Sequence, residues 1–298
     1  MKSKINKQFE SAPPSGLQVI WREFKKDKLA LCSLIVIGSL IVGILIAAFF
    51  IDQEKVMTID LHKRFTKPGV DGFILGADQA GRDILGQLII GSRNSLIIAM
   101  VITLFTGIVG IVLGMMMGYY GGYFDQLLMR TIDFFMTLPT LMIIIVFVSL
   151  IPKFGVWELI VMMSLFLWVG TARLVRSKVL SEGRRDYVSA SKTMGASDVS
   201  IMFKEILPNL SSIIIVELTL SFAGNVGIET GLSFLGFGLP PSTPSLGTLV
   251  SYATNPQVLA DKYWVWLPAS LVILVFMLGI NYIGQALRRS ADVKQRFG

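Results

Sequence analysis

Long uncharged apolar runs alternate with shorter polar segments along the chain. A transmembrane helix needs about 20 apolar residues, because lipid offers no hydrogen-bond partner to an open backbone. Six runs approach or exceed this length: 29–51, 95–120, 134–152, 154–172, 210–236 and 263–287. The fourth run is interrupted near one end by Glu158, and the fifth contains Glu217 and Glu229. The pattern predicts an all-α integral membrane protein with six transmembrane helices.

The composition supports the membrane assignment. Apolar residues make up 53% and charged residues 16% of the 298 residues, whereas soluble proteins carry roughly 25% charged residues. The single cysteine, Cys32, excludes an intramolecular disulfide, and the single histidine, His62, excludes a His/Cys metal cluster. His62 lies in a polar segment without an evident catalytic partner. We therefore expect a chain that is not an enzyme and holds no metal.

The basic residues predict the orientation, because cytoplasmic loops carry an excess of Lys and Arg. With the N-terminus inside, 19 of the 27 basic residues lie on the cytoplasmic side, and both termini are cytoplasmic. We interpret the net charge of +7 as this bias rather than as a sign of nucleic-acid binding. The expected organisation is a cytoplasmic segment 1–28, a first transmembrane helix 29–51, an external segment 52–94 with an interfacial helix, a core 95–287 of five transmembrane helices that includes the cytoplasmic loop 173–209, and a cytoplasmic tail 288–298.

The external segment contains an unusually specific polar stretch, Leu75-Gly-Ala-Asp-Gln-Ala-Gly-Arg-Asp83. Gly81 permits a tight turn, and nearby charges are expected to form a local ion-pair network: Asp78, Arg82 and Asp83. Apolar residues at helical spacing over 84–90 predict an amphipathic helix at the outer interface. We interpret the region as a structured cap ahead of the second transmembrane helix, with a direct substrate site as the alternative.

A glycine-rich segment, Gly118-Tyr-Tyr-Gly-Gly-Tyr-Phe-Asp125, joins the second and third runs. No GxxxxGK[ST] pattern occurs in the chain, so it has no P-loop for ATP. Gly121 and Gly122 are expected to allow a tight turn at the inner surface. Charged residues should anchor the adjoining helices there: Asp125, Arg130 and Asp133.

The long cytoplasmic segment 173–209 carries a helical pattern that ends at a glycine. Tyr187, Ala190, Ser191 and Met194 recur at i, i+3, i+4 and i+7, which predicts one face of a short helix. Gly195 can end this helix, Ser197 or Asp198 can cap a second one, and Pro208 closes the unit. Two short helices at right angles are typical of an element that enters a partner's groove; re-entry of the chain at the membrane interface is the alternative. The predicted docking residues are Tyr187, Ala190, Ser191, Met194, Gly195, Ala196 and Ser197.

This loop resembles the EAA loop of importer permeases of the ATP-binding-cassette (ABC) superfamily, which reads roughly E-A-A-x-x-x-G and, about nine residues later, I-x-L-P. The matching positions are Ala190, Gly195, Leu207 and Pro208, whereas Ser189 and Ser191 replace the family's Glu and Ala. That replacement removes the first-position acid from which a salt bridge to the ATPase could form.

Three other stretches resemble one subfamily, the dipeptide/oligopeptide/nickel permeases. Residues 75–83 resemble its LGTDxxGRD signature with Ala77 in place of Thr, and 118–139 fit its inner loop. Residues 232–247 resemble its LSFLGxGxxPPxPSWG segment, with Leu246 in place of Trp. The resemblance covers about 24–285, and the short N-terminal part favours the C-type subunit.

The resemblance implies a six-helix type I ABC importer permease with cytoplasmic coupling helices, in a bacterial or archaeal cell membrane. Its partners are then a paralogous permease in a heterodimer, two cytosolic ATPases that bind ATP and Mg, and an external solute-binding protein. The chain itself binds no cofactor. Di- or oligopeptides are the expected substrate, with glutathione, nickel or a metal chelate as alternatives. A proton-coupled secondary transporter is the alternative from a different class.

Carboxylates inside a membrane are functional candidates. Glu217 lies about 13 Å along the helix from Pro208, near mid-depth, and Glu229 lies near the outer interface. Asn225 is within roughly 40° of Glu229 around the helix axis. These three residues are the pathway candidates, because either acid could bind the ammonium group of a peptide. Buried pairing with a neighbouring helix is the alternative.

Overall fold

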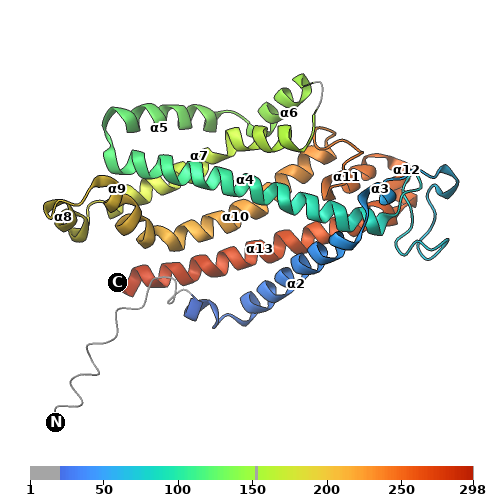
Figure 1. Ribbon diagram of the computed structural model, residues 1–298, viewed down its shortest axis with the longest axis horizontal. Helices are drawn as coiled ribbons and strands as arrows, with labels where there is room; N and C mark the ends of the chain where they lie inside the picture. The colour runs from blue at the N-terminus through green and yellow to red at the C-terminus, as the bar shows by residue number, and fades with distance from the viewer. Residues whose placement is uncertain (1–20, 152–153, 298) are drawn as a thin grey trace, which may run out of the picture.

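The computed structural model describes residues 21–151 and 154–297, and this part of the chain is helical apart from turns and one isolated β-bridge. The long helices run side by side along the long axis of the molecule (Figure 1). The elements are α2 (Lys28–Phe50), α3 (Gln53–Val56), η1 (Leu61–Lys63), α4 (Ile84–Tyr120), α5 (Gly122–Thr137), α6 (Thr140–Leu150), α7 (Val156–Glu182), α8 (Asp186–Thr193), α9 (Asp198–Ser200), η2 (Ile201–Ile206), α10 (Leu207–Phe234), α11 (Leu246–Ser251), η3 (Tyr252–Thr254), α12 (Pro256–Asp261) and α13 (Tyr263–Phe297).

Five helical stretches are long and apolar enough to cross a membrane: Lys28–Phe50, Ile84–Tyr120, Val156–Glu182, Asp198–Phe234 and Tyr263–Ala291. The pair α5 and α6, bent by 83°, makes a sixth if it is counted as one span. The all-α membrane fold is thus confirmed. Residues 1–20, most of the predicted N-terminal segment, lie outside the described residues.

The third predicted run, 134–152, is not one helix. α5 ends at Thr137, the backbone is extended at Leu138 and Pro139, and α6 begins at Thr140. Proline lacks an N–H and disfavours the helical conformation of the residue before it, which explains the break. With 11 residues, α6 is about 16 Å long, too short to cross about 30 Å of hydrocarbon alone.

The separate interfacial helix predicted for 84–90 is also wrong, because these residues are the first turns of α4, which continues for 37 residues. Asp83 caps α4 by accepting hydrogen bonds from the backbone N–H groups of Leu85 and Gly86. Ile84 is fully buried and Leu88 packs against the core, while Leu85 and Ile89 are half-buried. At Ile84 and Leu88 the apolar spacing therefore marks contacts within the protein.

Two further boundaries differ from expectation for identifiable reasons. Glu158 does not interrupt a span; it accepts a hydrogen bond from the Gly155 N–H at 2.9 Å and so stabilises the start of α7. Pro208 does not close the loop, since α9, η2 and α10 form one uninterrupted helical stretch. η2 is a π-helix in which the Leu207 N–H bonds to Met202 O, five residues back, and Pro208 follows at the start of α10. The cytoplasmic helix predicted after Ser197 is thus continuous with a span.

Close contact between α4 and α7 forms the spine of the bundle. A Cβ atom at Gly114 would lie 2.6 Å from Ala172 O, and one at Gly118 would lie 2.6 Å from Val179 Cβ. Small residues at such positions let two helices approach within a membrane. α10 packs between α4 and α13, and α2 packs on α13 (Figure 1). Residues of α7, α10 and α13 line one cavity, which we call the inner cavity.

Candidate functional site

The α8–α9 loop turns at Gly195, as predicted. Gly195 has φ +81°, its N–H bonds to Lys192 O at 3.0 Å, and the N–H of Ala196 bonds to Ser191 O at 3.1 Å. These two bonds make a Schellman motif, which ends α8. Ser197 then caps α9 by accepting a hydrogen bond from Ser200 N–H at 3.3 Å.

The structure divides the predicted docking face. Ala190, Met194, Gly195 and Ser197 are exposed, Met194 to 79%. The other three residues turn toward the protein: Ser191 is buried and donates to Glu205 Oε2 at 2.7 Å, while Tyr187 and Ala196 are half-buried. Tyr187 and Ser191 therefore hold the loop in place, whereas the exposed four form its outer surface.

Sequence reasoning missed an apolar residue on this surface and a contact beneath it. Val199 is 59% exposed. Tyr119, at the end of α4, donates its hydroxyl hydrogen to Asp198 Oδ1 at 2.6 Å, and the Lys192 ammonium lies 4.5 Å from the centre of the Tyr119 ring. The loop is therefore attached to α4 as well as to α10. No sequence spacing connects residue 119 to residue 198.

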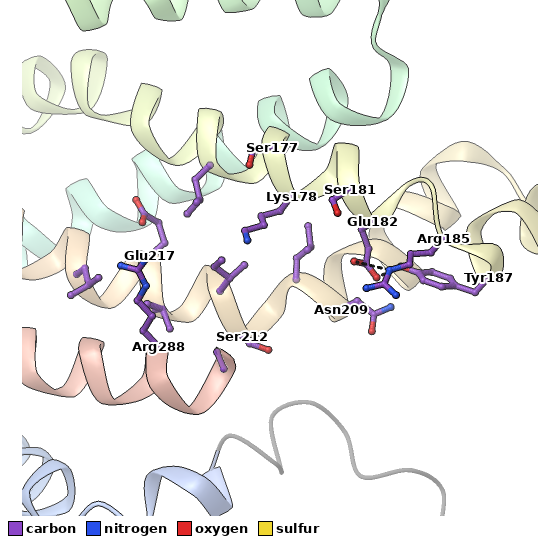
Figure 2. A pocket seen from close by; sticks show the side chains of 16 residues that line it. Ser177, Lys178, Ser181, Glu182, Arg185, Tyr187, Asn209, Ser212, Glu217 and Arg288 are labelled. Carbon is purple, nitrogen blue, oxygen red and sulfur yellow. Dashed lines mark hydrogen bonds and ion pairs between the residues drawn. The ribbon is translucent and has the colours of Figure 1, made fainter. Parts of the chain in front are cut away.

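A cavity of about 870 Å³ lies beside the loop, between α7, α10 and α13 (Figure 2). Its charged lining residues come from all three helices and the α7–α8 turn: Lys178, Glu182, Arg185, Glu217 and Arg288. Smaller polar and apolar side chains complete the wall, among them Ser177, Ser181 and Ser212. Glu217 thus borders an open space, as a pathway candidate should.

Tyr187 connects the cavity to α8. Its hydroxyl donates to Glu182 Oε1 at 3.1 Å, and Arg185 Nε lies 3.9 Å from the other Glu182 oxygen. Burial raises the pKa of the Tyr187 hydroxyl, so this group remains a hydrogen donor well into the alkaline range. The first turn of α8 is therefore part of the cavity wall.

The other two pathway candidates lie elsewhere. Glu229 is fully buried and accepts hydrogen bonds from Ser95 Oγ at 2.9 Å and Ser233 Oγ at 3.0 Å. Asn225 is buried and donates to Thr103 Oγ1 at 2.9 Å. Both side chains hydrogen-bond α10 to α4, which is the buried pairing with a neighbouring helix that the sequence left open as the alternative. Neither residue lines the cavity.

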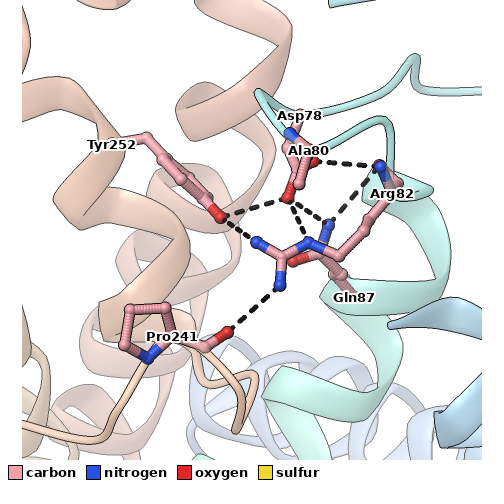
Figure 3. Close-up of polar contacts among 6 residues, drawn as sticks. All are labelled: Asp78, Ala80, Arg82, Gln87, Pro241 and Tyr252. Carbon is pink, nitrogen blue, oxygen red and sulfur yellow. Dashed lines mark hydrogen bonds and ion pairs between the residues drawn. The ribbon is translucent and has the colours of Figure 1, made fainter. Parts of the chain in front are cut away.

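At the opposite end of the bundle, Asp78 and Arg82 form a buried ion pair of 2.8 Å (Figure 3). Arg82 also donates to Tyr252 Oη at 2.8 Å and to Pro241 O at 3.2 Å, and Tyr252 donates to Asp78 Oδ2 at 3.1 Å. Burial is the main cause that raises the pKa of Tyr252. The network connects residues 75–83 to the segment that follows α10. This stabilising role agrees with the interpretation of the region as a structured cap.

The remaining residues of this stretch have separate tasks. Asp83 caps α4 and is not part of the network, contrary to expectation. Gly81 has φ +75°, and a Cβ atom there would lie 1.8 Å from Asp60 O, so no other residue fits.

The inner turn between α4 and α5 is built as predicted around two glycines. Gly121 and Gly122 have φ of +63° and +62°. Asp125 is paired with Arg176 of α7, with Nη2 and Oδ2 2.6 Å apart, and Asp133 lies 3.7 Å from Arg173. Arg130 is exposed. The largely buried Asp125–Arg176 pair thus holds α5 along α7, whereas the half-exposed Asp133–Arg173 pair contributes little.

Comparison with known proteins places this bundle in the class of multi-pass transport permeases. A family model described as "Binding-protein-dependent transport system inner membrane component" matches residues 110–293. A second, "N-terminal TM domain of oligopeptide transport permease C", matches residues 15–68. The chain belongs to the family of binding-protein-dependent transport inner membrane components. It is the non-catalytic membrane component of such a system, and the family implies a binding protein and ATPases as partners.

Several relatives match over nearly their whole length. The chain is 51% identical over 276 residues to the oligopeptide transport system permease protein OppC of Lactococcus lactis subsp. lactis (strain IL1403), covering 93% of this chain and 94% of the relative. It is 36% identical over 291 residues to the dipeptide transport system permease protein DppC of Haemophilus influenzae, covering 95% and 96%. It is 31% identical over 281 residues to OppC of Bacillus subtilis (strain 168), covering 93% and 90%. The resemblance to importer permeases is confirmed.

Proposed function

We propose that this chain is the oligopeptide permease subunit of an ABC importer and forms the translocation path together with a paralogous permease. The observation that carries the proposal is the 51% identity, over 93% of the chain, to a permease named for oligopeptide transport. The match of residues 15–68 to the N-terminal domain of oligopeptide permease C supports the same substrate class. An external binding protein delivers the peptide, and two cytosolic ATPases bind ATP and Mg.

The end of the molecule that carries the α8–α9 loop is the cytoplasmic end in this proposal. The start of α2, the α8–α9 loop and the end of α13 lie toward the same end of the bundle (Figure 1), and 18 of the 27 basic residues of the sequence fall in 1–28, 173–209 and 288–298. This supports the positive-inside orientation, with 1–28 and 288–298 in the cytoplasm and most of 52–94 outside. The Asp78–Arg82 network then stabilises an external cap.

The α8–α9 loop is the proposed ATPase-docking element. Its outer surface includes Ala190, Met194, Gly195, Ser197 and Val199, which suits insertion into a groove of a partner. Because the loop continues without a break into α10 and is bonded to α4, a displacement at the docking surface reaches two transmembrane helices. Alternation between an inward-open and an outward-open state requires such a connection.

Uptake measurements distinguish the proposal from its alternatives. Vesicles that contain the complete importer should accumulate tri- to pentapeptides only with internal ATP, and accumulation should survive a proton ionophore. Loss with the ionophore would identify a proton-coupled secondary transporter. ATP-driven accumulation of nickel or a metal chelate, without peptide uptake, would replace the substrate class and leave the importer mechanism intact.

A further inference from the structure

The charged side chains around the inner cavity fall into two groups. Glu182 is engaged by Tyr187 and Arg185 within the wall. Glu217, Lys178 and Arg288 take part in none of the seven ion pairs found among the described residues. In the same part of the chain, the Glu217 carboxylate accepts one hydrogen bond, from Ser221 Oγ at 3.4 Å. The wall therefore presents one carboxylate and two cations to a ligand.

These charges differ in how far they are removed from water. Glu217 and Lys178 are half-buried, on α10 and α7, whereas Arg288 of α13 is exposed. In Figure 2, the Lys178 side chain points from α7 into the space beside α10. Charges that are partly removed from water attract an opposite charge more strongly than exposed ones, which solvent and salt screen. Glu217 and Lys178 are thus the two groups best placed to bind a ligand with an ammonium and a carboxylate group.

The dimensions of the cavity suit a short peptide. Its volume is about 870 Å³, within the range of roughly 300–1,000 Å³ that is typical of ligand pockets. Asn209 and Glu217, both in the wall, are about 12 Å apart along α10. Three extended residues span about 10 Å. A tripeptide can therefore lie in the cavity along α10, and the Lys178 side chain of α7 points into the same space (Figure 2).

We propose that the inner cavity binds a transported peptide by its free termini, with Glu217 as the ligand of the α-ammonium group and Lys178 as the ligand of the α-carboxylate. This rests on the proposed oligopeptide function. Every unmodified peptide carries both groups, so the site accepts peptides regardless of sequence. The apolar part of the wall, Leu174, Ile213, Val216 and Leu220, receives side chains without demanding a particular hydrogen bond.

The test uses the complete importer, purified with its partner subunits in nanodiscs, and a thiol placed in the cavity. Ser177 lines the cavity and is exposed, so Ser177→Cys reports access through its rate of alkylation by a charged maleimide. Cys32→Ser removes the native thiol of this chain. Mass spectrometry of this subunit follows the reaction in the presence of trialanine, N-acetyl-trialanine or trialanine amide.

Trialanine should protect the thiol at about tenfold lower concentration than either blocked peptide, since each blocked peptide loses one ion pair. In Glu217→Gln, the preference for a free ammonium group should disappear while the preference for a free carboxylate remains. In Lys178→Gln, the opposite pattern is expected. Asp261→Asn removes an exposed carboxylate in α12, at the other end of the bundle, and should leave both preferences unchanged.

Two outcomes overturn the proposal: absence of protection by trialanine, or a preference for the free ammonium group that persists in Glu217→Gln. Uptake of tri- and pentaalanine by the same complex, reconstituted with its binding protein, is measured in parallel. ATP-driven peptide uptake without protection refutes the cavity site and leaves the oligopeptide function standing. Absence of ATP-driven uptake of both peptides refutes the oligopeptide function itself.

Discussion

Ser191 of α8 donates its hydroxyl hydrogen to Glu205 Oε2 of η2 over 2.7 Å. The bond crosses the turn at Gly195, so it connects the exposed helix of the loop to the helix that continues into α10. Ser191 is 9% exposed. Its task is therefore to hold α8 in place, while a partner meets the neighbouring exposed residues.

Ser191→Ala should loosen α8 without changing its outer surface. A hydrogen bond of this kind contributes about 1 kcal/mol net, so amide hydrogen exchange over 187–195 should become about fivefold faster. Ser189→Ala is the matched control, because Ser189 is exposed on the same helix. Equal exchange rates in the two variants would show that the bond does not stabilise the loop.

Gly195→Asp should separate ATP hydrolysis from transport. The φ of +81° disfavours any side chain, while no atom lies within 4 Å of the added Cβ, so the strain is conformational rather than steric. The aspartate also adds a charge to the proposed docking surface. Peptide uptake should fall strongly, whereas Gly195→Asn, which tolerates this conformation better, should retain more of it. Normal uptake in Gly195→Asp would refute the docking assignment.

The sequence predicts the positions of most spans because lipid imposes the same length and polarity on every helix. It does not predict where prolines break them. Pro139 ends α5 in the middle of an apolar run, whereas Pro208 is accommodated in a continuous helix by the π-helix before it. Both prolines lack an N–H. Whether the helix breaks or continues depends on whether the preceding turn can shift its hydrogen bonds.

The site was predictable only where it depends on local backbone conformation. Gly195 and Ser197 act as expected, because helix ends follow from the residue at one position. The spacing of Tyr187, Ala190, Ser191 and Met194 correctly predicts a helix, but spacing does not say which side of that helix meets the protein. The cavity combines α7, α10 and α13, which are distant in sequence, so it could not be predicted.

Tyr252→Phe should weaken the external cap. The hydroxyl accepts from Arg82 and donates to Asp78, and its removal leaves part of a buried ion pair without a partner, at a cost of about 1–3 kcal/mol. Thermal unfolding of the purified complex and limited proteolysis of 52–83 should both reveal this. Tyr263→Phe is the control, since Tyr263 is exposed at the start of α13. Unchanged proteolysis in Tyr252→Phe would contradict a stabilising role.

The stabilisation by the Tyr252 hydroxyl should depend on pH in the alkaline range. Burial raises the pKa of Tyr252 above its ordinary value of 10.0. The folded protein therefore holds this proton at pH values at which the unfolded chain has lost it. The contribution of the Tyr252 hydroxyl to the free energy of unfolding is complete below pH 10 and is lost as pH rises further. The difference in stability between wild type and Tyr252→Phe should therefore shrink above pH 10. A constant difference up to the alkaline limit of folding would contradict this.

Glu229 should matter for stability rather than for substrate, in contrast to Glu217. Its two oxygens accept from Ser95 of α4 and Ser233 of α10, and Ser95 Oγ accepts in turn from the Leu246 N–H of α11 at 3.0 Å. Glu229→Leu removes both acceptors from a fully buried position and should cost about 1–3 kcal/mol for each hydroxyl left unsatisfied. A double-mutant cycle isolates the contact: Ser95→Ala should destabilise wild type more than it destabilises Glu229→Leu. Glu217→Leu provides the comparison, because Glu217 is half-buried beside the cavity and its loss should leave the unfolding temperature nearly unchanged. Strict additivity of Ser95→Ala and Glu229→Leu would show that the Ser95–Glu229 bond does not hold α4, α10 and α11 together.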